Sequence, residues 1–167
     1  MSKIKIINAG LLLTLLTGCA SFGPINTAEF APKIRQDIPT IDGKILEKSH
    51  ATFLPGINGY NLADNFFEAG PLRTGKAGAI VVTDQRLYFV EWKSEKYQLL
   101  WDLDYRLIKS IEIRSMGRGK RLVVCFNKSP EVASFDITSD GTFIDAKTTT
   151  AIGQLIARQS GKTCKLP

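Results

Sequence analysis

The feature that most constrains the fold is an alternation of apolar and polar residues with a period of two, which begins at Lys44 and runs through most of the chain. A period of two places successive side chains on opposite faces of an extended strand. The clearest alternation predicts that one face of a single strand carries Tyr97, Leu99, Trp101 and Leu103. In all, seven strands are predicted: Ile45–Phe53, Gly78–Val82, Arg86–Trp92, Tyr97–Leu103, Leu107–Arg114, Arg121–Phe126 and Val132–Ile137.

Short strands separated by turn residues predict antiparallel sheets that close into a barrel or a sandwich. After the last strand the period changes to that of a helix, with apolar or small residues at Ile144, Thr148, Ile152, Leu155 and Ile156. We expect Asp140 or Thr142 to cap this helix and Gly161 to end it. The predicted class is therefore mainly β (α+β), with one amphipathic helix at the C-terminus.

Two stretches of sequence resemble the GRAM and bacterial PH-like domains. Residues 78–89 form a glycine-led strand that reaches Thr83-Asp84, turns, and returns through Arg86-Leu87-Tyr88-Phe89. Residues 101–112 are similar to the next signature of these domains, in which a polar-apolar step leads into an Ile-x-Ser-Ile strand. The resemblance covers about residues 78–159, and residues 44–77 depart from the compact pattern.

The resemblance implies a PH-like domain over residues 44–161 and a C-terminal tail over 162–167. It also implies a binding or adaptor module for lipids or proteins that has no catalytic residues. Eukaryotic members bind phosphoinositides through basic residues in an early loop. Residues 55–59 have no such basic cluster, so this ligand class is not carried over.

The N-terminal residues have the layout of a secretory signal. Lys3 and Lys5 precede an apolar run of eleven residues, Ile6–Leu16, which is too short for a bilayer that needs roughly 20 helical residues. The run leads into Leu16-Thr17-Gly18-Cys19, which resembles the lipobox of bacterial lipoproteins. The resemblance implies that residues 1–18 are removed and that Cys19 carries a diacylglyceryl group and often a third acyl chain, such as palmitate. The alternative is an ordinary signal peptide with an incidental cysteine.

The residue after Cys19 helps to predict which membrane holds the protein. In lipoproteins an Asp at this position often retains the protein in the inner membrane, and here the residue is Ala20. For a Gram-negative source the resemblance implies an anchor in the outer membrane, with the domain facing the periplasm or, less often, the cell surface.

Between the anchor and the first strand, residues 19–43 read as a tether. Gly23, Pro24, Pro32, Pro39 and Gly43 interrupt this segment, which has no sustained periodicity. A flexible chain of this length reaches roughly 27 Å. The alternative is an ordered segment, because three isoleucines have helical spacing, although Pro39 falls among them: Ile34, Ile38 and Ile41.

The chain has a formal net charge of +6, which falls to +4 when Lys3 and Lys5 are removed with the signal peptide. A mild basic excess suits anionic lipid headgroups or cell-wall polymers as partners. An export signal argues against nucleic acid. The sequence predicts no cofactor beyond the lipid on Cys19 and no metal site, because the only histidine, His50, has no neighbouring cluster of metal ligands.

Export would also place Cys125 and Cys164 in an oxidising compartment, where thiols are usually paired. Leu122, Val124 and Phe126 mark the core face of their strand, so Cys125 points the other way. We expect a disulfide between Cys125 and Cys164. The alternative is a half-buried Cys125 and a free Cys164 in a frayed tail.

Four basic residues lie around a glycine-bearing turn and form a candidate patch for an anionic ligand: Arg114, Arg118, Lys120 and Arg121. Arginine and lysine bind phosphate or carboxylate groups through charge-assisted hydrogen bonds. The alternative is a solvated hairpin whose charges protect the strand edges from aggregation.

These observations favour a membrane-anchored envelope lipoprotein with a non-catalytic PH-like binding or adaptor domain. One alternative is an accessory subunit of an envelope assembly complex, bound through an exposed strand edge. Another is a hydrolase that acts on cell wall or lipid. It would need His50 near a carboxylate and a nucleophile, and Asp102 and Asp104 are more naturally read as exposed charges.

Overall fold

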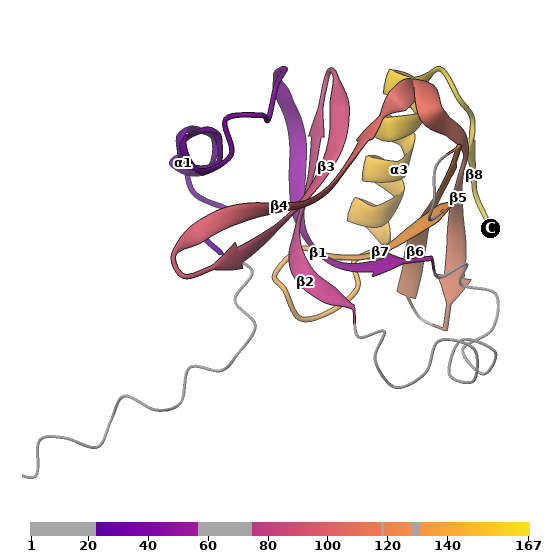
Figure 1. Ribbon diagram of the computed structural model, residues 1–167. Coiled ribbons are helices and arrows are strands. Elements are labelled where there is room, and N and C mark those ends of the chain that lie inside the picture. The colour runs from indigo at the N-terminus through magenta and orange to yellow at the C-terminus, as the bar shows by residue number, and fades with distance from the viewer. Residues whose placement is uncertain (1–22, 57–74, 118, 128–130) are drawn as a thin grey trace, which may run out of the picture.

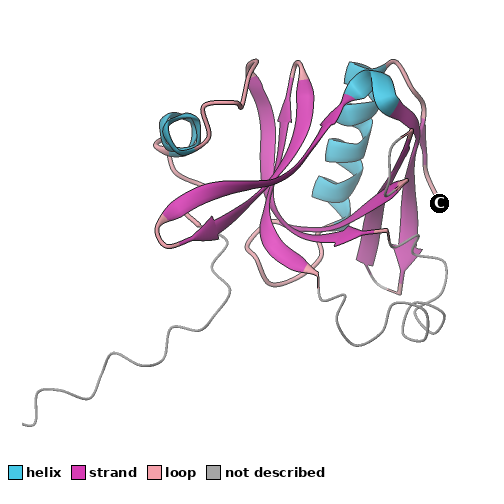
Figure 2. Cartoon of the chain, in the orientation of Figure 1, coloured by secondary structure: helices cyan, strands magenta, loops and turns pink. Residues whose placement is uncertain are grey.

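The computed structural model describes residues 23–56, 75–117, 119–127 and 131–167. Figure 1 shows the arrangement of the elements and Figure 2 colours them by type. In chain order they are α1 (Phe30–Asp37), β1 (Ile45–Pro55), β2 (Lys76–Thr83), β3 (Arg86–Lys93), β4 (Lys96–Asp104), the 3-10 helix η1 (Tyr105–Leu107), β5 (Ile108–Met116), β6 (Gly119–Phe126), β7 (Val132–Thr138), α3 (Ala146–Ser160) and β8 (Cys164–Lys165).

The seven predicted strands are confirmed, and each end differs from its prediction by at most two residues. The strands form a sheet in the order β4-β3-β2-β1-β7-β6-β5-β8, with β1 between β2 and β7. All neighbours pair antiparallel except β5 and β8, which are parallel. Cys164–Lys165 was expected to be tail and instead adds this short edge strand.

The sheet curls around one hydrophobic core, and aromatic rings join its two halves. Phe53 on β1 stacks on Phe89 of β3 at 5.1 Å and on Phe135 of β7 at 5.3 Å between ring centroids. Trp101 of β4 lies 5.7 Å from the ring of Phe126 on β6. The helix α3 packs its buried residues, including Ile152 and Ile156, into the same core. The helix therefore closes the sandwich from one side (Figure 1).

The ends of α3 follow from local chemistry. Gly161 adopts a left-handed conformation with φ of 65°, so the predicted end of the helix is confirmed. The predicted caps Asp140 and Thr142 are wrong, because Asp145 caps the helix. The Asp145 carboxylate accepts hydrogen bonds from the N–H groups of Lys147 and Thr148 at 2.9 and 3.0 Å.

A second hydrophobic core lies on the outer face of β2, β3 and β4. It is formed by Ala79, Val81, Tyr88, Val90 and Tyr97 from the strands and by the segment before β1. That segment contributes five buried apolar side chains: Ile25, Phe30, Ile34, Ile38 and Ile41. The flexible tether expected over residues 19–43 is therefore wrong for residues 23–43. The helical spacing of the isoleucines reflects α1, which ends two residues before Pro39.

Polar contacts hold the segment in place. The carboxylate of Asp37 accepts the backbone N–H of Tyr97 at 2.9 Å. The hydroxyl of Tyr88 donates to the carboxylate of Asp42. Full burial of one large apolar side chain contributes about 1.5–3 kcal/mol, so the five side chains together supply roughly 8–15 kcal/mol before entropy is subtracted. This gross energy favours a docked segment over a flexible one.

The prediction that β4 has one continuous apolar face is also wrong. The register between β3 and β4 shifts between Phe89 and Val90, where Trp101 and Leu99 are the respective partners. Such a β-bulge reverses the direction of the side chains along a strand. As a result Tyr97 lies in the second core, whereas Trp101 and Leu103 belong to the first. Leu99 and Leu100 at the bulge are left 37% and 38% exposed.

Candidate functional site

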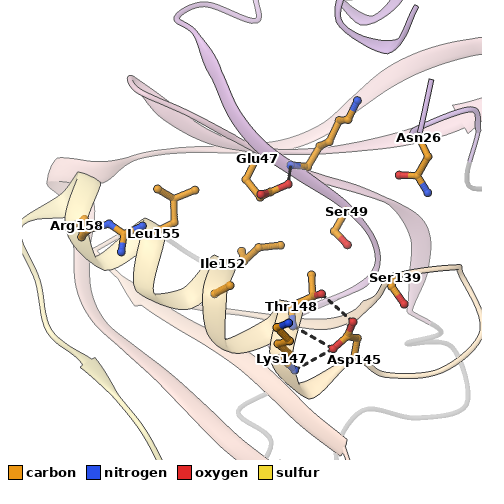
Figure 3. A pocket seen from close by; sticks show the side chains of 12 residues that line it. Asn26, Glu47, Ser49, Ser139, Asp145, Lys147, Thr148, Ile152, Leu155 and Arg158 are labelled. Atoms are coloured by element: carbon orange, nitrogen blue, oxygen red, sulfur yellow. Dashed lines mark hydrogen bonds between the residues drawn. The ribbon is translucent and has the colours of Figure 1, made fainter. Parts of the chain in front are cut away.

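A groove of about 530 Å³ lies between the first half of β1 and the helix α3. The inner face of β1 contributes Glu47 and Ser49 to one wall, and α3 forms the other wall. Figure 3 shows Ile152 and Leu155 directed from the helix toward β1, where they form an apolar floor. We call this site the β1–α3 groove.

The helical period explains the wall of the groove formed by α3. Lys147, Ala151, Leu155 and Arg158 recur at intervals of three or four residues and therefore share one side of the helix. Lys147 and Arg158 are eleven residues apart, which corresponds to roughly 16 Å along the helix axis. The two cations thus flank the apolar floor, one near each end of the groove (Figure 3).

The two acidic side chains of the groove, Asp145 and Glu47, accept hydrogen bonds from residues close to them in sequence. Besides its two backbone contacts, the Asp145 carboxylate accepts a hydrogen bond from the Thr148 hydroxyl at 2.8 Å. The backbone N–H of Thr148 is the main cause that lowers the pKa of Asp145, so this group is anionic at neutral pH. The carboxylate of Glu47 accepts the N–H of Lys48 at 2.9 Å.

Three cations line the groove, and one of them, Lys48, places its Nζ atom 4.6 Å from the ring centroid of Phe30 in the second core. The two cations of α3 differ from it and from the acids. Lys147 and Arg158 are exposed, and neither forms an ion pair within the part of the chain that the structure describes. Their donors can therefore meet a group that enters the groove. Sequence reasoning missed both residues. The available signal was the placement of two cations three helical turns apart on the side of the predicted helix that carries Leu155.

The predicted basic patch is arranged differently from the expectation. The Arg114 guanidinium binds the Glu112 carboxylate at 2.7 Å, and the Arg121 guanidinium binds Asp136 through two contacts of 2.7 Å. Lys120 is half-buried, and Arg118 lies outside the described residues. Since carboxylates compensate two of the four charges, the hairpin is a weaker candidate for anion binding than the β1–α3 groove.

The predicted disulfide between Cys125 and Cys164 is wrong, because both are free thiols. Cys125 pairs with Ser110 on one side of β5, while Cys164 pairs with Ile111 on the other side. The two cysteines are thus two strand spacings apart, roughly 9–10 Å. A disulfide needs Cα atoms no more than about 7 Å apart. Burial raises the pKa of the Cys164 thiol.

The other sequence-predicted groups remain dispersed. Nδ1 of His50 lies 3.4 Å from the carbonyl oxygen of Ser139. Asp102 and Asp104 both form ion pairs with the guanidinium of Arg86. The structure describes no group of three His, Cys, Asp or Glu side chains that suits a metal ion among residues 23–56, 75–117, 119–127 and 131–167.

The N-terminal predictions fall outside these ranges. The signal peptide of residues 1–18 and the lipidated Cys19 lie outside the described residues. Among the helices of the described chain, none combines the length and apolar character needed to cross a bilayer.

Comparison with known proteins identifies the fold. A search of protein families found no match, and a search of curated proteins found none either. Among solved structures, the hSac2 domain of the human phosphoinositide phosphatase Sac2 superimposes with a TM-score of 0.53 at 7% identity, over 82% of this chain and 85% of that one. The Slm1-PH domain in complex with phosphoserine gives a TM-score of 0.47 at 9% identity, over 70% of this chain and 96% of that one.

At these identities the likeness concerns the fold alone. The chain has a mainly β, PH-like arrangement in which an open antiparallel sheet curls around the core and one C-terminal helix covers it. The predicted fold class is confirmed.

Proposed function

We propose that this protein is a lipoprotein of the cell envelope and that its PH-like domain is a non-catalytic binding module. Residues 1–18 are removed, and Cys19 carries the acyl chains that hold the protein in the outer membrane, facing the periplasm. The ligand site is the β1–α3 groove. The ligand has an anionic group and an apolar part, and no cofactor besides the covalent lipid takes part.

The observation that carries the proposal is the pair of cations beside an apolar floor in the β1–α3 groove. Ligand sites are concave and largely apolar, with a few polar groups that fix the orientation of the ligand. Lys147 and Arg158 supply those groups. Ala151 and Leu155 supply the accessible apolar surface, and Ile152 lies fully buried in the same lining. A phosphate or carboxylate at either end would gain charge-assisted hydrogen bonds.

Calorimetric titration of the soluble Cys19→Ser form, without its signal peptide, tests this assignment. The probes are a short-chain phosphatidylglycerol, the matching phosphatidylcholine, and glycerol phosphate, which has the anionic group alone. We expect phosphatidylglycerol to bind more tightly than the other two. If glycerol phosphate binds equally well, the ligand is a free phosphate or an anionic polymer and the apolar floor plays no part.

A charge-removing pair of substitutions locates the binding site. Lys147→Gln with Arg158→Gln removes the cation that binds the single phosphate, whichever end of the groove it occupies. This charge-assisted contact is worth about 1.5–3 kcal/mol, so affinity should fall at least tenfold. The matched control is Lys109→Gln with Lys162→Gln, two exposed cations outside the groove. An equal loss in both pairs would show that binding is a general response to positive charge.

A second candidate function is an accessory subunit of an envelope complex, and the edge strand β4 favours it. β4 ends the sheet and exposes Leu99 and Leu100. An unpaired strand edge can add a strand from another protein. A photo-cross-linking residue at Gln98, compared in cells with one at Thr163, distinguishes the candidates. One near-stoichiometric adduct at position 98 only would support the accessory subunit.

A further inference from the structure

The docked N-terminal segment limits how the domain can stand on a membrane. We infer that it holds the tip of the β3–β4 hairpin against the headgroup layer of the bilayer that anchors Cys19. This inference rests on the proposed lipidation of Cys19. It goes further, because a flexible tether of 24 residues would let the domain face the membrane in any orientation.

The first step is the contact between Gly23 and Trp92. A Cβ atom on Gly23 would lie 2.9 Å from the indole ring of Trp92, and the φ of Gly23 is +73°. A side chain at this position would meet both the ring and an unfavourable backbone conformation. The chain therefore enters the domain directly on Trp92, and Ile25 is already fully buried.

The second step is the length of chain that remains. Gly23 follows Cys19 by four residues, so the attachment point lies within roughly 14 Å of the backbone of Gly23 even when the chain is fully extended. A segment of 24 residues would span about 80 Å by the same measure. The surface around Gly23 must then stay close to the headgroups.

The third step is the chemistry of that surface, which we call the anchor face: Pro24, Thr27, Trp92, Lys93 and Lys96. Two exposed carboxylates, Glu29 and Glu95, border this face, and the cations Lys33, Lys93 and Lys96 outnumber them. Lys93 and Lys96 are paired across the hairpin at its tip, and both are exposed. Trp92 is half-buried, and the Nζ atom of Lys33 lies 5.8 Å from its ring centroid. Tryptophan is enriched at the level of lipid headgroups, and lysine extends its ammonium group into water beside them.

This orientation has a consequence for the rest of the domain. Figure 1 shows α1 and the β3–β4 hairpin at one side of the molecule, with β5, β6 and the C-terminus at the other. The basic hairpin of β5 and β6 then faces away from the anchoring bilayer. The β1–α3 groove lies nearer to it, because Asn26, three residues after Gly23, lines the groove.

Tryptophan quenching in vesicles tests the orientation, because the chain has two tryptophans. The lipidated protein is placed in phosphatidylethanolamine and phosphatidylglycerol vesicles that contain a phospholipid brominated near the headgroup. With Trp101→Phe, the emission of Trp92 should fall by roughly half or more, since interfacial tryptophans lie at headgroup level. With Trp92→Phe, the emission of Trp101, which is half-buried against the first core and outside the anchor face, should stay unchanged.

Two further preparations separate this inference from the proposed function. A Gly/Ser insertion of about twelve residues between positions 22 and 23 adds roughly 40 Å of reach and should abolish the quenching. If the protein floats with vesicles but Trp92 is quenched no more than Trp101, the inference is wrong and the anchor stands. Persistent quenching despite the insertion also overturns it. If the protein does not float with vesicles, the anchor itself is wrong.

Discussion

Arg121 on β6 and Asp136 on β7 form two parallel contacts of 2.7 Å, one from Nε and one from the terminal guanidinium nitrogen. The side chains are only 10% and 18% exposed. This geometry satisfies both charges on the outer face of the sheet, which explains why a strand with so many apolar neighbours tolerates a buried arginine.

Removing one partner of this pair should be costly. Arg121→Met leaves the Asp136 carboxylate without its partner and should lower the free energy of unfolding by about 3–5 kcal/mol in a urea titration. The double variant Arg121→Met with Asp136→Leu should recover most of this loss. Arg106→Ala is the matched control, because this arginine is 87% exposed in its pair with Asp104 and its loss should change the free energy of unfolding far less. Equal losses in the single and double variants would contradict the assignment.

The second core predicts a large effect for a residue outside the strands. Phe30 is fully buried and lies 5.2 Å from the ring of Tyr97 in an edge-on contact. Phe30→Ala should therefore lower the free energy of unfolding by about 3–5 kcal/mol. Ala28→Gly, at an exposed position in the same segment, is the control. A loss for Phe30→Ala no greater than that of the control would indicate that the segment is a flexible tether after all.

The cap of α3 predicts a dependence on pH. The folded state lowers the pKa of Asp145, so its contribution to stability is present above the unfolded value near 4 and is lost as the pH falls through the folded value. Asp145→Ala should cost about 1 kcal/mol at pH 7 and flatten the acid limb of the stability curve. Asp145→Asn keeps an acceptor for the helix N–H groups and should cost less. Thermal melts between pH 3 and pH 7 would measure both effects. An acid limb that is the same in all three proteins would contradict the role of this carboxylate.

The thiols give a prediction about redox state. Cys125 and Cys164 are separated by β5, so neither can reach the other while the sheet is intact. Protein purified from an oxidising compartment and unfolded without reductant should add an alkyl group at each of the two cysteines. Intact mass measures this directly. A mass that shows neither cysteine alkylated before reduction, and both after it, would establish the disulfide that the structure lacks.

The sequence predicted the strands and the C-terminal helix well, but it did not predict the β-bulge in β4 or the docking of residues 23–43. An alternation of two is a local property, so strand ends such as Arg86 and Phe126 could be read from neighbouring residues alone. The bulge at Leu99 and Leu100 could not, because it depends on the partner strand β3. Pro39 concealed the docked segment, since it interrupts a periodicity that belongs to a short helix and the turn after it.

The candidate site was harder to predict for the same reason. Lys147 and Arg158 line a groove only because β1 faces α3, and β1 is about 100 residues away in sequence. The arginines of the β5–β6 hairpin show the reverse: the sequence predicted them as a binding site, and the structure pairs Arg114 and Arg121 with carboxylates. Asp136, the partner of Arg121, lies on the neighbouring strand β7, whose register no local pattern specifies. Glu112, the partner of Arg114, lies two residues earlier on the same strand β5, so the alternation of two already placed it on the same face.

The most direct test of the central claim is a titration followed by the methyl resonances of isoleucine and leucine in the soluble Cys19→Ser form. With short-chain phosphatidylglycerol as ligand, we predict saturable shifts at Ile152 and Leu155, the floor of the β1–α3 groove, and none at Leu166 in the C-terminal tail. The shifts should disappear in the Lys147→Gln, Arg158→Gln variant. Shifts confined to residues outside the groove, or no saturable shift at Ile152 and Leu155, would contradict the account.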